Sequence, residues 1–169
     1  MKTKKLTVLA LLSAVALTIF IVEAQIPPLT PIPGIKLGLA NIITVYTVFA
    51  LGAKEGAAVL FVRIFLGALF SGNFGTILYS GAGGALAILT TIALKPVLKN
   101  KQLWIAGCLG AIAHSVGQTI VAVWATGTPS FLIYLPILIL CSIFTGIFTG
   151  LCAQFMLNRG SQIWKTIFK

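Results

Sequence analysis

Three polar side chains stand inside long apolar runs of this sequence, and their types could recognise a charged or carbonyl-rich ligand. Arg63 lies in the middle of KEGAAVLFVRIFLGALFSG, residues 54–72. His114 and Gln118 are four residues apart in GAIAHSVGQ, so they share one face of a helix. An arginine offers fixed donors to phosphate or carboxylate, and histidine and glutamine add directional hydrogen bonds. The three residues indicate a binding site for a molecule with an anionic or carbonyl-rich end.

Further polar residues lie at or near the ends of the apolar runs. Asn41 belongs to KLGLANIITVYT, Glu23 lies near the end of the first run, and Asn73 near the end of the third. The predicted ligand-binding residues are Arg63, His114, Gln118, Asn41, Asn73 and Glu23. An arginine near the centre of a membrane helix costs about 2.5–3.5 kcal/mol, so it needs a partner or a function. The alternative is a structural role, in which these groups satisfy one another's hydrogen bonds and brace the helices.

The residue types that the sequence lacks exclude several kinds of chemistry. There is no aspartate, and Glu23 and Glu55 are the only glutamates, so neither a carboxylate cluster for Mg²⁺ nor a carboxylate pair for acid–base work can form. The sequence has no G-x-x-x-x-G-K-[ST] loop for ATP. Cys108, Cys141 and Cys152 lack the paired spacing of a metal site or a disulfide framework. We therefore expect a protein that is not an enzyme and holds no metal or cofactor.

The elements that must position these residues are long apolar helices. Hydrophobic residues make up 59% of the 169 residues and charged residues 8%, a composition suited to lipid rather than to water. The apolar runs do not alternate with polar residues as the strands of a barrel do. Six membrane spans are predicted, at 6–22, 35–51, 57–71, 76–94, 103–125 and 131–157. The predicted fold is an all-α membrane protein, a single six-helix domain over residues 1–169.

The net charge of +10 is explained by the position of the basic residues relative to the predicted spans. Most of them fall on one side of a six-helix threading: Lys2, Lys4, Lys5, Lys54, Lys95, Lys99, Lys101, Arg159, Lys165 and Lys169. Only Lys36 falls opposite, and Arg63 lies within a span. The positive-inside rule then predicts that both termini are cytoplasmic, with residues 158–169 as a basic interfacial tail. No basic stripe alternates with exposed aromatic residues, so nucleic acid is not an expected partner.

The first apolar run has two features of its own. Its basic start and the Val22 to Ala24 ending resemble a secretory signal, but its apolar stretch is longer than a signal core, so we expect a retained membrane anchor. Ala10 and Ala14 form an A-x-x-x-A pattern, which lets another helix approach closely. We expect this pattern to bind a partner subunit, whereas the Gly146 and Gly150 pattern of the sixth run fits packing within the chain.

Four segments in order, IPGIKLGLANI, RIFLGALFSG, GAIAHSVGQ and YLPILILCSIFTGIFTGL, resemble the bacterial family of heptaprenyl diphosphate synthase component I, also called the Gx transporter family. The resemblance covers residues 32–157. The synthase name implies prenyl chain elongation, which needs aspartate-rich motifs that a chain without aspartate cannot supply. The resemblance therefore implies at most a non-catalytic accessory or scaffold subunit for isoprenoid, quinone or redox enzymes.

More distantly, six helices with A-x-x-x-A on the first are similar to the substrate-binding S components of energy-coupling factor (ECF) transporters. This likeness implies capture of an amphipathic, anionic small molecule in a midplane cavity, under a lid at residues 25–34. It also implies a transmembrane coupling protein, contacting Ala10 and Ala14, and cytoplasmic ATPases that power transport. The location implied is the bacterial cytoplasmic membrane. We expect this substrate-binding function and keep the accessory subunit as the alternative.

Overall fold

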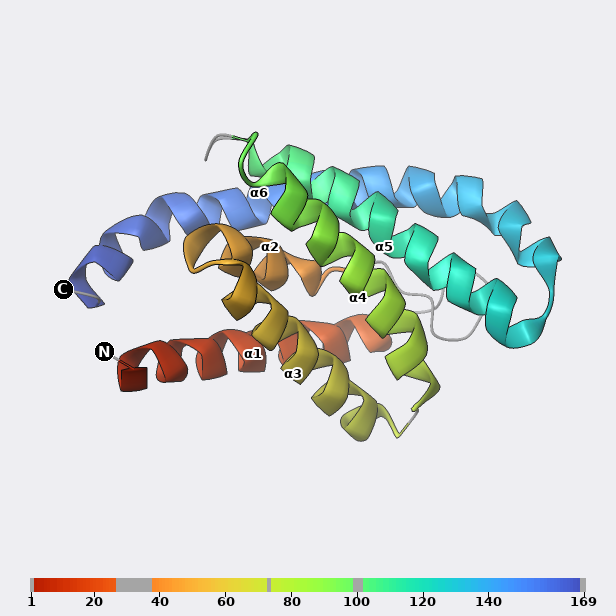
Figure 1. The fold of residues 1–169 in the computed structure, drawn as a ribbon, viewed down its shortest axis with the longest axis horizontal. Helices are drawn as coiled ribbons and strands as arrows, with labels where there is room; N and C mark the ends of the chain where they lie inside the picture. The colour runs from red at the N-terminus through yellow and green to blue at the C-terminus, as the bar shows by residue number, and fades with distance from the viewer. Residues whose placement is uncertain (1, 27–37, 73, 99–101, 168–169) are drawn as a thin grey trace.

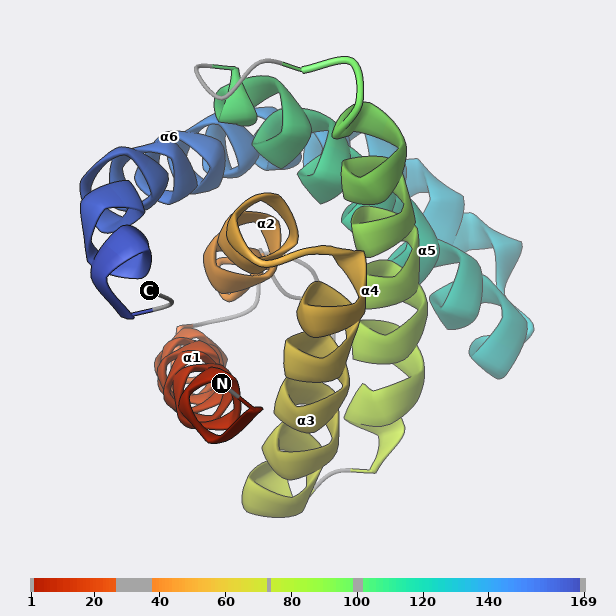
Figure 2. The same ribbon diagram turned by 60° about the vertical axis from the view of Figure 1, so that its left-hand side comes forward.

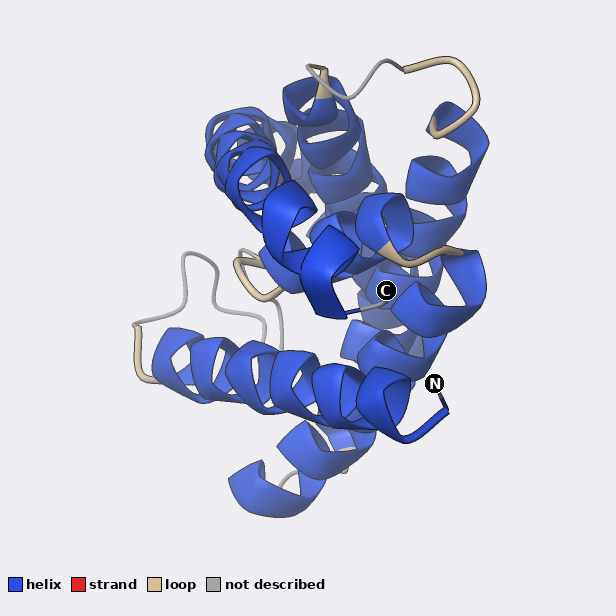
Figure 3. Cartoon of the chain, turned by 90° about the vertical axis from the view of Figure 1, so that its left-hand side faces the viewer, coloured by secondary structure: helices blue, strands red, loops and turns tan. Residues whose placement is uncertain are grey.

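The structure is a computed structural model that describes residues 2–26, 38–72, 74–98 and 102–167. These residues form helices and no strand (Figure 3), which confirms the predicted all-helical class. The elements are α1 (Lys2–Ala24), α2 (Asn41–Ala50), α3 (Ala53–Ser71), α4 (Gly75–Leu94), α5 (Leu103–Thr126), the short 3₁₀ helix η1 (Pro129–Tyr134) and α6 (Leu135–Ile167).

Four of these helices are long and apolar enough to cross a membrane. They lie within Thr3–Ala24, Ile77–Leu94, Leu103–Thr126 and Pro129–Gly160. α2 has only 10 residues, and α3 has 19 residues that include Lys54, Glu55 and Arg63. A ten-residue helix is about 15 Å long, half the thickness of the hydrocarbon core. The structure therefore supports a membrane protein, while the number of six spans stays a prediction.

The predicted start of the second helix is wrong. Residues 38–40 form a turn, and the helix begins at Asn41 rather than at residue 35. Residues 27–37, which include most of the predicted lid at 25–34, lie outside the described part of the chain. Gly38 has a φ of +80°, which a residue with a Cβ rarely adopts and which no right-handed helix contains. The chain therefore turns at Gly38 before it can enter the helix.

Two other predicted boundaries also differ from the structure. α3 begins at Ala53, because Lys54 and Glu55 join its first turn instead of belonging to the loop. α6 continues to Ile167, so the backbone of most of the predicted tail is helical. Charged residues at the end of an apolar run do not break a helix, since lysine, glutamate and arginine have good helix propensity.

α2 occupies the middle of the molecule, with α1, α3, α4 and α6 around it in Figure 2. Seven of its ten residues are buried, including Thr44 and Thr47. Figure 1 shows that α1 begins and α6 ends at the same end of the bundle as the connection from α2 to α3. The α3–α4 and α5–α6 turns lie at the opposite end. Successive helices from α2 onward therefore run in alternating directions.

α5 packs against both α4 and α6 at close range, because glycines remove the side chains between the backbones. A Cβ at Gly107 would clash with the Gly146 carbonyl oxygen, and a Cβ at Gly146 would lie 2.6 Å from the Cα of Cys108. Ser115 and Ser142 share a hydrogen bond of 2.6 Å across the same pair of helices. These contacts fix α5, the helix that carries His114.

Polar contacts also join helices at the end where the chain begins. Lys5 on α1 pairs with Glu55 at the start of α3, with 2.5 Å between Nζ and Oε1. Lys95, just after α4, donates to the carbonyl oxygen of Val48 in the last turn of α2 at 2.6 Å. A cation at this position also interacts favourably with the dipole of α2.

Candidate functional site

Arg63 points into the bundle from the inward face of α3. Gly56, Leu60, Arg63 and Gly67 are buried at helical spacing, and Arg63 is only 2% exposed. Its Nη1 donates a hydrogen bond of 3.2 Å to Oδ1 of Asn41, the first residue of α2. Its Nε has no hydrogen-bond partner within the described residues. The guanidinium therefore keeps an unused donor in the interior of the protein.

Glu23 brings the only described buried carboxylate to this region from the last turn of α1. Its Oε1 accepts a hydrogen bond of 2.5 Å from the backbone N–H of Gly38. The carboxylate also attracts the Arg63 guanidinium electrostatically. Glu23 thus holds the end of α1 against the turn that leads into α2 and supplies a negative charge near the arginine.

His114 enters from α5 between two glycines. A Cβ at Gly38 would lie 3.2 Å from its Cδ2, and a Cβ at Gly83 on α4 would lie 2.9 Å from its Nδ1. Nδ1 has no hydrogen bond of acceptable geometry within the described residues, although it lies beside the Gly83 backbone. The imidazole is therefore tightly enclosed, and one of its nitrogens is available for a proton donor or acceptor.

These side chains border one small cavity. It is lined by Phe20, Glu23, Gly38, Ala40, Arg63, Ser80 and His114. The space for the centre of a water-sized sphere is about 10 Å³, which is close to the room that a single water needs. The cavity joins a cation, a carboxylate, an imidazole and a hydroxyl from α1, α3, α4 and α5. As it stands it can hold a water molecule against Arg63 but not a larger ligand.

The structure brings together four of the six predicted ligand-binding residues: Glu23, Asn41, Arg63 and His114. Gln118 is fully buried one turn from His114, where its Cγ would lie 2.9 Å from a Cβ at Gly83. It does not line the cavity. Asn73 lies outside the described residues. Ala10 and Ala14 are exposed on α1, a position that leaves them accessible to a partner helix.

Four residues that line the cavity were not predicted: Phe20, Gly38, Ala40 and Ser80. Ser80 begins the SGAGGALA segment of α4, where small residues indicate close packing but no ligand chemistry. No three His, Cys, Asp or Glu side chains in the described part of the chain come together as a metal site. The donor set suits water or an anion.

The fold and this cluster define a small helical membrane protein with a polar centre. The chain belongs to the family described as heptaprenyl diphosphate synthase component I, whose family model matches residues 12–156. No curated protein and no solved structure matches the chain. The resemblance to this family is thus confirmed, whereas the more distant likeness to ECF S components is not shown; the matched range contains every residue of the cavity.

Proposed function

We propose that this protein is the substrate-binding membrane subunit of a transporter and that Arg63 binds the anionic end of an amphipathic small molecule. One observation supports this proposal above the others: Arg63 is 2% exposed, lines a cavity, and keeps Nε without a partner in the described residues. A buried polar group left unsatisfied costs about 1–3 kcal/mol, and more when it is charged. A group that only braced the bundle would gain stability by closing that gap.

The surrounding residues divide the task of binding. Arg63 donates from its Nε to an anionic oxygen, and Asn41 orients the guanidinium through Nη1. His114 contributes an imidazole to the lining of the same cavity. Since the cavity has room for a single water, binding of a larger ligand requires the helices around Arg63 to separate.

The protein captures its ligand and partner proteins supply the energy. The chain has no nucleotide-binding loop, so a transmembrane coupling protein and cytoplasmic ATPases would drive release, with the exposed Ala10 and Ala14 on α1 as a contact for the coupling protein. The chain itself is not an enzyme in this proposal. Its location is the bacterial cytoplasmic membrane, with both termini inside.

Native mass spectrometry of the protein purified in mild detergent tests ligand binding directly. We expect a co-purifying small molecule with the wild-type chain, loss of that molecule in Arg63→Ala and Arg63→Met, and partial retention in Arg63→Lys, which keeps the charge. Arg159→Ala is the matched control, because Arg159 is an exposed cation on α6. If Arg63→Ala and Arg63→Met express and fold normally and still retain the molecule, Arg63 is not the binding group.

Co-purification tests the partners. A tagged wild-type chain should recover a coupling protein with ATPases, and a bulky residue at Ala10 or Ala14 should release them while the small molecule stays bound. Recovery of neither partner under mild conditions counts against a transporter subunit, whatever the state of the ligand.

A second candidate function is a non-catalytic accessory subunit of an isoprenoid enzyme. The family description favours it, because a component I implies another component. The chain has no aspartate to hold Mg²⁺ against a diphosphate, so catalysis would reside in the partner. Co-expression with a soluble prenyl synthase from a neighbouring gene should then give a complex whose activity needs this chain. Unchanged activity without the chain excludes this role.

A further inference from the structure

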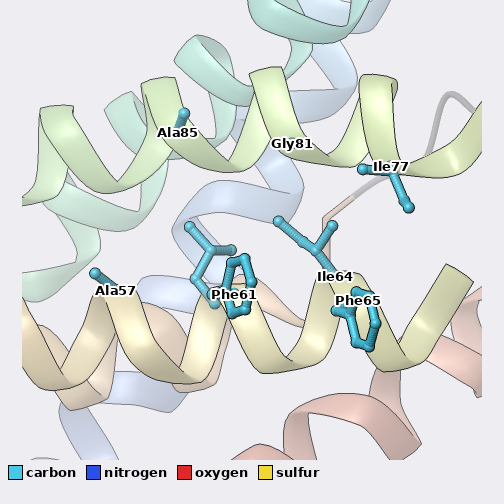
Figure 4. A pocket seen from close by; sticks show the side chains of 8 residues that line it. Ala57, Phe61, Ile64, Phe65, Ile77, Gly81 and Ala85 are labelled. Atoms are coloured by element: carbon cyan, nitrogen blue, oxygen red, sulfur yellow. The ribbon is translucent and has the colours of Figure 1, made fainter.

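A second hollow lies on the outer side of the same two helices that border the Arg63 cavity. Figure 4 shows it as a groove between α3 and α4. It is open, has a volume of about 280 Å³ and is lined by Ala57, Leu60, Phe61, Ile64, Phe65, Ile77, Gly81 and Ala85. Ligand pockets range from about 300 to 1,000 Å³. The groove lies just below this range, close to the size of a small ligand pocket, whereas the Arg63 cavity is far smaller.

The groove and the Arg63 cavity lie at the same level of the helix pair. Arg63 and Ser80 line the polar cavity, and the next residue in each helix, Ile64 and Gly81, lines the groove. Between α3 and α4, Leu60 and Ile64 pack against Gly84, where a Cβ would lie 2.9 Å from Leu60 Cδ1. A ligand with a charged head and an apolar tail would have to pass between these two helices to engage both hollows.

The groove wall combines two stacked aromatic rings with missing side chains. Phe61 and Phe65 stack with their centroids 6.3 Å apart and their planes 7° from parallel. A Cβ at Gly81 would meet no atom within 4 Å, so the α4 wall of the groove is open. Two aromatic side chains on α3 and a strip of glycine and alanine on α4 thus give the groove an apolar lining that can accept a hydrocarbon chain.

We propose that this groove binds the hydrocarbon tail of the anionic ligand whose head binds Arg63, so that the substrate is a single-chain anionic amphipath that enters from the bilayer between α3 and α4. This inference rests on the proposed function of Arg63. Lipid is as apolar as the groove, so moving a hydrocarbon tail from lipid into the groove gives little hydrophobic free energy. The groove instead selects among tails by how well they pack against its wall. Prenyl and acyl chains share this chemistry.

Binding of two diphosphates with the same head tests the proposal. The protein in lipid nanodiscs is titrated with farnesyl diphosphate and with dimethylallyl diphosphate, which lacks the long tail, and dodecyl phosphate separates an acyl-like chain from a prenyl chain. Gly81→Leu fills the groove and should weaken binding of farnesyl diphosphate roughly fivefold or more. Binding of dimethylallyl diphosphate should not change. Ala85→Leu, a second substitution on the groove wall, should act in the same direction.

Two controls separate groove filling from damage to the fold. Gly81→Ala adds a methyl group that meets open space and should leave both affinities unchanged. Leu89→Phe changes an exposed position of α4 outside the groove and should do the same. If the leucine variants lose affinity for both diphosphates equally, or lose affinity for neither, the groove is not the tail site. Such a result does not contradict the proposed role of Arg63. Failure of the wild-type protein to bind any of the three probes instead contradicts the anionic head site.

Discussion

Arg63 is held less well than a purely structural arginine would be. Its one hydrogen bond to a described side chain, to Asn41, is 3.2 Å long, whereas charge-assisted hydrogen bonds are usually about 2.7–2.9 Å. Its countercharge, Glu23, is partly engaged by the Gly38 backbone. The cluster therefore leaves hydrogen-bonding capacity at its centre, at a cost to the free energy of folding that the proposed binding role would explain.

The charge of Glu23 can be separated from its hydrogen bond by two substitutions. Glu23→Gln keeps an acceptor for the Gly38 N–H but leaves the Arg63 cation without its carboxylate, and we expect a loss of about 3 kcal/mol in the free energy of unfolding. Glu23→Ala also removes the acceptor and should lose about 1–3 kcal/mol more. Unfolding by denaturant in detergent measures both differences.

A double substitution provides the check on this interpretation. In Glu23→Gln, the further change Arg63→Met removes the uncompensated buried cation and should restore part of the lost stability. If the double variant is no more stable than Glu23→Gln, the two charges do not compensate each other in the folded protein.

The sequence predicted the charged and amide members of this cluster better than its neutral members. Arg63, His114, Asn41 and Glu23 are costly in an apolar helix, so their presence alone indicated a site. Ser80 costs little there, because a serine can bond to its own helix backbone, and so it gave no signal. Gly38 lines the cavity because the chain before α2 meets His114 of α5. No local sequence pattern contains information about such a contact between distant segments.

At the scale of helices, the type of element was predictable and several ends were not. Each of the six predicted apolar runs overlaps one of the six described α-helices, although α2 is shorter than its run. The start of α2 depends on the turn at Gly38, and Gly38 is set by its contacts with Asn41 and His114 rather than by hydropathy. The end of α6 differs from the prediction because the apolar run stops near residue 157, while polar residues such as Arg159 continue the helix beyond it.

The close approach of α5 and α6 predicts an uneven response to added methyl groups. Gly146→Ala places a Cβ within 2.6 Å of the Cys108 backbone, so the helices must move apart at a cost of about 1–3 kcal/mol. Gly81→Ala, in open space on α4, should be neutral or stabilise by up to about 1 kcal/mol through helix propensity. Thermal unfolding in detergent compares the two, and equal midpoints would show that the α5–α6 contact is not tight.

The pair between α1 and α3 predicts a dependence of stability on pH. The hydrogen bond from Lys5 lowers the pKa of Glu55 below its usual 4.5, its backbone hydrogen bond lowers it further, and burial opposes both. A depressed carboxylate pKa stabilises the folded state above pH 4.5, and this contribution is lost as the pH falls through the folded-state pKa. Because the Lys5 side chain is 44% exposed, the pair contributes only about 0.5 kcal/mol.

Glu55→Gln isolates this contribution. The wild-type protein should unfold slightly later than the variant at pH 7, and the difference should vanish in acid once Glu55 is protonated. A difference between the two proteins that is the same at both pH values would mean that the Lys5–Glu55 pair adds no electrostatic stability.

At the scale of the whole molecule, the distribution of positive charge predicts one orientation in the membrane. Lys5, Lys54 and Lys95 gather at the end of the bundle where α1 begins and α6 ends. Positive charge marks the cytoplasmic side of membrane proteins. The opposite end carries the α3–α4 and α5–α6 turns, and the Arg63 cavity lies between the two ends. A ligand that enters between α3 and α4 thus reaches Arg63 from the bilayer, without crossing the basic end.

Single cysteines in a chain whose three native cysteines are replaced by serine test this orientation. Lys54→Cys and Lys95→Cys should react with a membrane-impermeant maleimide only in inside-out vesicles. Gly72→Cys and Thr128→Cys, in the turns at the opposite end, should react only in intact cells stripped of any outer barrier. α2 is half the length of a span, so length alone does not show which of the helices after it cross the membrane. Lys54 and Gly72 lie at the two ends of α3, and their labelling shows whether α3 crosses. If Gly72 reacts from the same side as Lys54, α3 does not cross the membrane and Arg63 does not lie at the membrane centre. Labelling from opposite sides places α3 across the bilayer, where an arginine needs the ligand chemistry proposed for it.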